Sequence, residues 1–362
     1  MHVVPDIRVI WLRRLLPTRL YPGWRRVGAP LSTLRLPPGV PAFDGLDWYW
    51  FPSLVRAARF LVRERPAVLV LEWWTAAALH TYLALAWIAS RLGATVVVEF
   101  HEIQDPGEAE IRLLSWYVRR FMPSLLARTS GVIAHSQAEL DAIRSAWSIA
   151  DKHLVVIPHG EYDHYLGGIP LREAPPHACN FLYFGVIRPF KGVETLVRAF
   201  QSFSADEIAD YWLTIVGETW EGWTLPRDLL EDGPHQERIT FVNRYVTDAE
   251  ASGYFAGADV VVLPYRRPTQ SGPLHIAMAH GLPLVASEVG GITEATAGYE
   301  GAILVPPDSP ERLVAAMRQA ALSRNRRFAG SHAWKEIAPR YARFLREVDS
   351  RLGLQPGASG GE

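Results

Sequence analysis

The segment "ADVVVLPYRRPTQSGPLHIAMAHGLPLVAS" (258–287) decides the fold, because its pattern predicts a strand, a helix and a second strand in immediate succession. Its two ends are short apolar runs rich in valine and leucine, which is typical of buried strands. Between them, Ser271 suits a helix N-cap and Pro273 suits the first helical turn. Gly281, with Pro283 two residues later, predicts the helix end. The helix therefore begins just beyond the carboxyl end of the first strand.

The same alternation runs through most of the chain. Short β-branched runs separated by helical segments indicate parallel strands that are covered on both faces. A looser Gly- and Pro-rich segment (161–178) interrupts the rhythm and predicts a linker. We therefore expect an α/β protein with two Rossmann-like, doubly wound domains that face each other across a cleft and bind ligands at the carboxyl ends of their strands. The predicted strands include 67–74, 94–100, 131–136, 153–160, 180–186, 211–217 and 238–244.

Composition excludes several classes of protein. With 362 residues, 49% of them hydrophobic, the chain is long enough for two ordinary cores. Its formal net charge of −1 gives no reason to expect a nucleic-acid partner. The single cysteine, Cys179, excludes an intrachain disulfide and a thiolate zinc site, and it fits a reducing cytosol. We find neither a run of about 18 apolar residues that could span a membrane nor the pattern of a signal peptide.

The start of the helix in the opening segment is suited to an anion. The amides of Ser271 and Gly272 would lie at the positive end of the helix dipole, where a phosphate or a sugar hydroxyl can bind. The alternative is a capped helix that binds nothing.

Four motifs in the second half support the ligand-binding interpretation. They occur in order as "FGVIRPFKGVETLVRAF" (184–200), "FVNRYVTDAEASGYFAGADVVVLPY" (241–265), "SGPLHIAMAHGLPLVASEVGGITE" (271–294) and "GAILVPPDSPERLVAAM" (301–317). Together they resemble the donor-binding half of the retaining glycosyltransferases of family 4, which have the GT-B fold. In the first half the resemblance is carried by "VVVEFHE", "GVIAHS" and "VIPHG", which are weaker motifs.

The resemblance implies a set of donor-binding residues. Arg188 and Lys191 would hold the pyrophosphate, because a departing diphosphate needs cations; the alternative is a pair of surface cations. Glu294 is either a ligand or a first-turn residue favoured by the helix dipole. The other donor-side residues that the motifs imply are Gly185, Arg244, Tyr245, Gln270, Ser271, Gly272, Pro273, Gly290 and Gly291.

One departure from the family pattern concerns two glutamates eight positions apart that many members carry around this helix. Pro268 and Ile276 stand at those places, and neither can act as a carboxylate. The chain instead resembles a subgroup whose helix follows Gln-Ser-Gly, in which Gln270 and the next two amides face the donor. His275 is a candidate for contacting the ribose, although a histidine in such a helix is more often a packing residue.

In the first half, His101 and Glu102 directly follow a predicted buried strand. The resemblance places His101 beside the reacting sugar, with a structural histidine as the alternative. Glu102 is a candidate base for the acceptor hydroxyl, but Asp105, Glu108 and Glu110 lie nearby in the chain. In addition, "PHG" resembles the family's Pro-Asn-Gly turn, with His159 in place of asparagine and Gly160 as a backbone contact.

No metal and no cofactor are expected. The chain has no Asp-x-Asp triplet, the carboxylate motif with which transferases of the other large fold commonly hold a divalent ion against the diphosphate. The nucleotide sugar would be a substrate, and the acceptor would be a saccharide or a polyprenyl-linked glycan.

We expect four regions along the chain. Residues 1–170 form an acceptor-side domain, 171–330 the donor-binding domain, 331–352 a helix that crosses back to the first domain, and 353–362 a disordered tail. The first domain lacks its first β-α unit, either because the start codon lies further upstream or because the domain is shortened.

The first 28 residues interleave tryptophan and leucine with arginine. They form either an interfacial basic patch or an ordinary loop and helix with a solvated basic face. The first interpretation predicts a cytoplasmic protein at the inner face of the plasma membrane.

The sequence therefore predicts a glycosyltransferase. The alternatives are a nucleotide-sugar epimerase of the same fold and a catalytically inactive nucleotide-sugar-binding protein.

Overall fold

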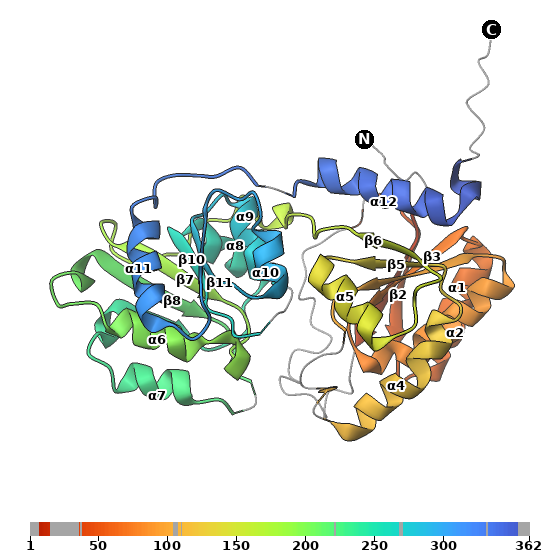
Figure 1. Ribbon diagram of the computed structural model, residues 1–362, viewed down its shortest axis with the longest axis horizontal. Coiled ribbons are helices and arrows are strands. Elements are labelled where there is room, and N and C mark those ends of the chain that lie inside the picture. Colours follow the sequence, from red (N-terminus) through yellow and green to blue (C-terminus); the bar gives the residue numbers. More distant parts are fainter. Residues whose placement is uncertain are drawn as a thin grey trace, which may run out of the picture. The chain divides into compact units, whose positions relative to one another are not determined.

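The computed structural model describes residues 7–14, 36, 38–103, 108–109, 111–220, 222–267, 271–330 and 332–353 (Figure 1). The chain divides into two compact units. Of the described residues, unit 1 takes in those up to Pro158 together with those from Trp334 onward, and unit 2 takes in those within His159–Ala333. The division therefore falls earlier than the expected boundary at 170. Among the described residues, no helix is both long and apolar enough to cross a membrane.

Unit 1 is built around a parallel sheet with strand order β3-β4-β5-β6. A separate parallel pair, β1 and β2, precedes it. The first of these strands is Val9–Arg14, whereas 15–28 lie outside the described residues. The strands are β1 (Val9–Arg14), β2 (Ala42–Asp47), β3 (Val68–Trp73), β4 (Thr95–Phe100), β5 (Gly131–Ala134) and β6 (His153–Val156). The helices are α1 (Phe51–Glu64), α2 (Leu79–Arg91), α4 (Arg112–Leu126), α5 (Gln137–Ala146) and α12 (Trp334–Val348).

Helices cover both faces of this sheet because each strand is apolar on both sides. In β4, Val96 and Val98 belong to the core that α2, α4 and α5 share, whereas Val97 belongs to the core under α12. This alternation follows from the two-residue period of a strand. Ile337 and Phe344 of α12 pack onto the second face, and Figure 1 shows α12 and α4 on opposite sides of the strands.

Unit 2 is a six-stranded parallel sheet with strand order β12-β11-β10-β7-β8-β9. Its strands are β7 (Cys179–Phe184), β8 (Tyr211–Val216), β9 (Ile239–Val242), β10 (Val260–Leu263), β11 (Leu284–Ser287) and β12 (Ala302–Val305). Its helices are α6 (Val193–Gln201), α7 (Leu225–Glu231), α8 (Asp248–Ala256), α9 (Gly272–Ala279), α10 (Gly290–Ala295) and α11 (Pro310–Ala321). The expected doubly wound arrangement is thus confirmed for this unit.

The helix that the sequence predicts between the strands β10 and β11 is present as α9. Ser271 is the N-cap of α9, and its hydroxyl accepts a hydrogen bond from the amide of Leu274 at 3.3 Å. Pro273 lies in the first turn, and Gly281 has a φ of +66° just beyond the helix. A left-handed residue at this place is a common helix terminator.

Candidate functional site

The strand order of unit 2 creates a natural ligand position. The chain proceeds from β7 to β8 and β9 on one side, and then returns to place β10 on the other side of β7. The carboxyl ends of β7 and β10 therefore form the switch point at which open α/β sheets bind ligands. The segment after β7 carries Arg188 and Lys191, and the segment after β10 leads through Tyr265 into α9.

Lys191 ends a short 3-10 turn, η4 (Pro189–Lys191). Its Nζ atom lies 3.8 Å from the ring centroid of Tyr265, which is a cation–π contact. Tyr265 is buried, and its hydroxyl lies 3.2 Å from the Oγ atom of Ser271. Burial also raises the pKa of Tyr265 to about 12, so the hydroxyl stays protonated. Lys191 is thus linked through Tyr265 to the N-cap of α9.

The guanidinium of Arg188 stacks on aromatic rings. Its Cζ atom lies 4.6 Å from the ring centroid of Trp220 and 5.9 Å from that of Phe190. Stacking holds the plane of a guanidinium in place, and a guanidinium is a group suited to binding a phosphate. The structure therefore brings two of the predicted cations to one loop at the switch point.

Glycines allow the backbone to approach closely around this loop. Gly185 has a φ of +132°, and a Cβ there would lie 3.6 Å from the ring of Pro273 in α9. Gly192 has a φ of +65°, and a Cβ there would collide with the carbonyl oxygen of Pro264. The predicted residues Gly185, Ser271, Gly272 and Pro273 therefore lie together. Gln270, by contrast, lies outside the described residues.

Sequence reasoning missed Arg266, which ties these segments together. Its guanidinium forms ion pairs with Glu194 of α6 and with Asp308. It also donates to the carbonyl of Pro189 at 3.1 Å, and its own amide donates to the carbonyl of Phe190 at 2.8 Å. Arg266 thus fastens η4, and with it Lys191, to the end of β10. The only sequence signal was the pair Arg266-Arg267 after the strand, and nothing local links it to Glu194, 72 residues earlier.

Arg244 and Tyr245 lie in a different place from the two loop cations. They follow β9, the edge strand, which is separated from β7 by β8. The Nη2 atom of Arg244 lies 2.5 Å from a carboxylate oxygen of Glu250, which also completes a capping box with Thr247 at the start of α8. In the structure, Arg244 therefore supports a helix terminus.

One interpretation of Glu294 is wrong. The helix α10 begins at Gly290 itself, so Glu294 is its fifth residue and no acidic residue lies in its first turn. Gly290 and Gly291 are the first two residues of this helix. Their amides lie at the start of α10, just after β11, and their contact with a ligand stays a prediction.

Two positions, Pro268 and Ile276, depart from the family pattern, and only Ile276 lies among the described residues. Ile276 is buried in the core of unit 2, whereas Pro268 lies outside the described residues. His275 is also buried, with its ring centroid 5.4 Å from that of His159 and 5.9 Å from that of Tyr162. This aromatic packing favours the structural interpretation of His275.

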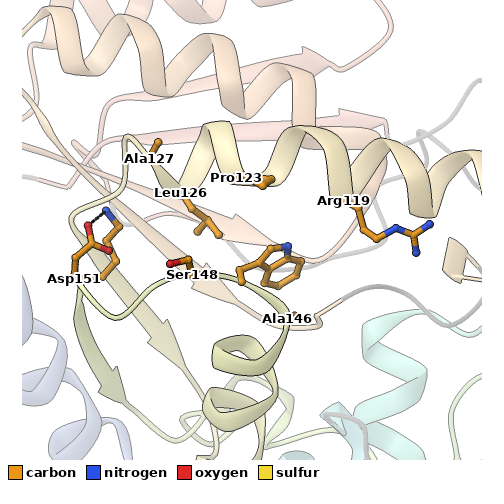
Figure 2. A pocket seen from close by; sticks show the side chains of 9 residues that line it. Arg119, Pro123, Leu126, Ala127, Ala146, Ser148 and Asp151 are labelled. Atoms are coloured by element: carbon orange, nitrogen blue, oxygen red, sulfur yellow. Dashed lines mark hydrogen bonds and ion pairs between the residues drawn. The ribbon is translucent and has the colours of Figure 1, made fainter.

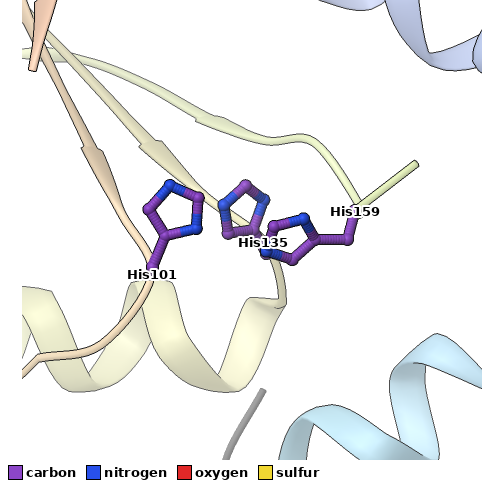
Figure 3. A group of neighbouring side chains, drawn as sticks. All are labelled: His101, His135 and His159. Carbon is purple, nitrogen blue, oxygen red and sulfur yellow. The ribbon is translucent and has the colours of Figure 1, made fainter. Parts of the chain in front are cut away.

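In unit 1, the candidate residues follow the central strands. His101 and Glu102 come directly after β4, where the amide of His101 donates to the carbonyl of Trp73 at 2.9 Å. The ring centroid of His135, just beyond β5, lies 4.9 Å from that of His101. Figure 3 shows both rings at the ends of their strands, together with His159 on the segment that follows β6.

Burial keeps these two histidines neutral. It lowers the pKa of His101 to about 4, and it lowers the pKa of His135 to about 4 with a further contribution from His101. Burial raises the pKa of Glu99, on β4, to about 7. The Nε2 atom of His135 lies 3.4 Å from a Glu99 oxygen, which is within ion-pair distance. Both shifts favour the uncharged forms, however, so at neutral pH His135 is uncharged and Glu99 is only partly ionised.

Hydrogen bonds fix the tautomer of His135. Its Nδ1 atom lies 2.9 Å from the carbonyl oxygen of Ile157, which can only accept, so Nδ1 carries the proton. The Nε2 atom therefore faces Glu99 as an acceptor. The hydroxyl of Tyr341, on α12, donates to the same Glu99 oxygen at 2.5 Å.

The carboxylates near His101 differ in their surroundings. Glu102 is half-buried. Glu108 accepts hydrogen bonds from the hydroxyl of Thr75 at 2.5 Å and from the amide of Ala76 at 2.8 Å, so it serves the start of the helical segment 76–91. Asp105 and Glu110 lie outside the described residues.

A pocket of about 600 Å³ in unit 1 is separate from all of these groups (Figure 2). It lies between the second half of α4 and the α5–β6 connection. None of the predicted site residues lines it. The lining residues are Arg119, Pro123, Leu126, Ala127, Ala146, Trp147, Ser148, Asp151 and Lys152.

Comparison with known proteins agrees with this architecture in both halves. Residues 178–322 match the family described as glycosyl transferases group 1, and residues 7–160 match the glycosyl transferase 4-like domain. The chain has the GT-B fold of family 4-type glycosyltransferases. Among solved structures, it resembles sucrose-phosphate synthase from Thermosynechococcus elongatus with a TM-score of 0.60 and 17% identity, over 88% of this chain and 86% of that one. HepE from Anabaena in complex with UDP-glucose gives a TM-score of 0.56 and 17% identity, over 87% and 85% of the two chains.

Curated relatives match over shorter stretches of this GT-B chain. A GDP-mannose:glycolipid 4-beta-D-mannosyltransferase of Xanthomonas campestris pv. campestris is 30% identical over 131 residues, 36% of each chain. A D-inositol 3-phosphate glycosyltransferase of Corynebacterium glutamicum is 25% identical over 256 residues, 67% of this chain and 57% of that one. The chain thus spans about a third of the first of these relatives and somewhat more than half of the second.

Proposed function

We propose that this protein transfers a glycosyl group from a nucleotide-sugar donor to a saccharide or polyprenyl-linked acceptor, with retention of configuration and without a metal. The observation that carries the proposal is the loop with Arg188 and Lys191 at the switch point of unit 2, directly beside the start of α9. Epimerase activity and binding without turnover remain as outcomes of the test below.

The proposed chemistry explains why these groups are needed. The bond between the anomeric carbon and the diphosphate oxygen breaks, the acceptor oxygen bonds to that carbon, and the acceptor hydroxyl loses its proton. Negative charge develops on the departing nucleoside diphosphate. Arg188, Lys191 and the amide of Gly272 at the positive end of α9 would stabilise that charge.

The acceptor-side residues are proposed to lie on unit 1. The neutral ring of His101 can hydrogen-bond a sugar hydroxyl without adding a positive charge. Glu102, which is half-buried and follows directly after β4 and His101, is the candidate base for the acceptor hydroxyl.

The names of the related proteins indicate which nucleotide sugars should be tested as donors. One relative is named for GDP-mannose, and a solved neighbour holds UDP-glucose. We therefore propose that the donor is a GDP- or UDP-sugar. The decisive experiment incubates the protein with radiolabelled GDP- and UDP-sugars and candidate acceptors, and then separates the products.

Each product identifies one function. Label on the acceptor supports the proposal, an altered free nucleotide sugar indicates an epimerase, and binding with no product indicates an inactive binding protein. One relative is named for a β-linked product. The anomeric configuration of the product, measured by NMR, therefore tests retention separately.

Metal independence is tested in the same assay. The two loop cations occupy the role that a divalent ion has in carboxylate-based transferases, so we predict that activity survives excess EDTA. Loss of activity with chelator and its return with manganese or magnesium would contradict this part of the proposal. The paired imidazoles of His101 and His135 are then the first place to look for the ion.

We also propose that the protein works in the cytoplasm as a peripheral protein at the inner face of the plasma membrane. The N-terminal arginines and tryptophans suggested this, and Trp11, on β1, is exposed. Most of that stretch lies outside the described residues.

A further inference from the structure

The outer surface of α1, α2 and α4 is strongly basic, although the chain as a whole has a net charge of −1. These helices lie side by side in unit 1 (Figure 1). Together they contain a single acidic residue, Glu64, which pairs with Arg8 and Arg63 at 3.2 and 2.8 Å. Their arginines are all exposed, and we call them the arginine face: Arg56, Arg59, Arg63, Arg91, Arg112, Arg119 and Arg120.

Large apolar side chains protrude between these arginines. Phe51, at the start of α1, is 73% exposed, and Leu113 and Trp116 of α4 are 70% and 53% exposed. On α2, Trp87 is exposed beneath the guanidinium of Arg91, whose Cζ atom lies 4.7 Å from its ring centroid. Soluble surfaces usually carry such side chains singly, so their concentration among arginines indicates a binding surface.

The helical period of α4 puts both kinds of side chain on one stripe. Its exposed residues recur every three or four positions, whereas Ser115, Val118 and Met122 face the core. Leu113 and Trp116 therefore point the same way as Arg112, Arg119 and Arg120. This helix contains no acidic residue at all.

We propose that the arginine face docks unit 1 on a membrane surface of anionic phospholipids. Each arginine near such a surface contributes about 1 kcal/mol of attraction, and the protruding leucine and tryptophan can enter the headgroup region. The apolar side chains decide the class of partner, because Leu113 and Phe51 gain nothing from the phosphates of a nucleic acid. This surface is distinct from the N-terminal stretch and independent of sugar transfer.

The test uses the full-length protein and sedimentation with vesicles of phosphatidylcholine alone or mixed with phosphatidylglycerol. We expect binding to the mixed vesicles only, and less of it at high salt because exposed charges are screened. The charge variant Arg119→Glu/Arg120→Glu and the apolar variant Leu113→Ser/Trp116→Ser should each reduce partitioning by at least about tenfold.

Matched controls come from exposed side chains of unit 2. Arg198→Glu/Arg312→Glu changes the net charge by the same amount, and Ile169→Ser/Leu322→Ser removes two exposed apolar side chains. Both should bind the mixed vesicles like wild type. Circular dichroism melting checks that all four variants are folded.

Three results would overturn the proposal. The first is a wild-type protein that does not bind the mixed vesicles. The second is equal loss of binding in the α4 variants and their unit 2 controls. The third is a Leu113→Ser/Trp116→Ser variant that binds like wild type while the charge variant does not, because such a surface recognises any polyanion.

Discussion

At the scale of single residues, Gly192 shows how tightly the proposed phosphate loop is built. It has a φ of +65°, and a Cβ would collide with the carbonyl oxygen of Pro264 at the end of β10. Alanine at a positive φ costs about 1 kcal/mol by itself, and overpacking adds about 1–3 kcal/mol. We predict that Gly192→Ala lowers the free energy of unfolding of unit 2 by the sum of both, as measured by urea denaturation.

Gly222 supplies a matched control for this prediction. Its φ is also +65°, but a Cβ there would meet no atom within 4 Å. Gly222→Ala should therefore show the conformational cost alone. Equal shifts of the unfolding midpoint in the two variants would mean that the loop and β10 do not approach as closely as the structure indicates.

At the scale of elements, the junction of β4, β5 and α12 should make the stability of the fold depend on pH. His135 has a pKa of about 4 in the folded protein and an ordinary value of 6.5, so between these values the unfolded chain binds the extra proton. Stability is then fully present above pH 6.5 and is lost toward pH 4, by up to about 3 kcal/mol. His135→Asn should flatten this acid-induced loss, as measured by urea unfolding at pH 7 and at pH 4.5.

As the pH falls, Glu99 should change the stability of the fold in the opposite direction to His135. Its raised pKa of about 7 means that the folded protein binds the extra proton between pH 4.5 and 7, so acidification stabilises the fold through this group. Glu99→Gln should therefore steepen the loss of stability at low pH. If the two variants change the slope in the same direction, the two groups are not held in their neutral forms.

At the scale of the whole molecule, the sequence predicted the features that depend on the local pattern of residues, such as strands and helix ends. Valine-rich runs located the strands, and Ser271, Pro273 and Gly281 marked both ends of α9. The first-turn interpretation of Glu294 failed because Gly290 and Gly291 are already part of the helix, whereas its alternative role as a ligand stays a prediction.

Long-range pairs could not be predicted from local pattern. Arg266 meets Glu194 across 72 residues, and Tyr341 meets Glu99 across 242. Such pairs depend on the order of strands in a sheet and on a helix that returns to the first unit. The family resemblance supplied the candidate cations, but only the structure shows that Arg266 holds their loop against β10.

Lys191 is proposed to belong to a diphosphate site at the switch point of unit 2. Calorimetric titration of UDP and GDP into wild-type and Lys191→Ala protein tests this assignment. The charge contact at stake is worth about 2–4 kcal/mol in the transition state, and a loss of 1.4 kcal/mol in the ground state already corresponds to about tenfold in Kd. We predict that wild type binds at least one of the two nucleotides and that folded Lys191→Ala binds it at least about tenfold more weakly. Unchanged affinity in the variant would contradict the assignment.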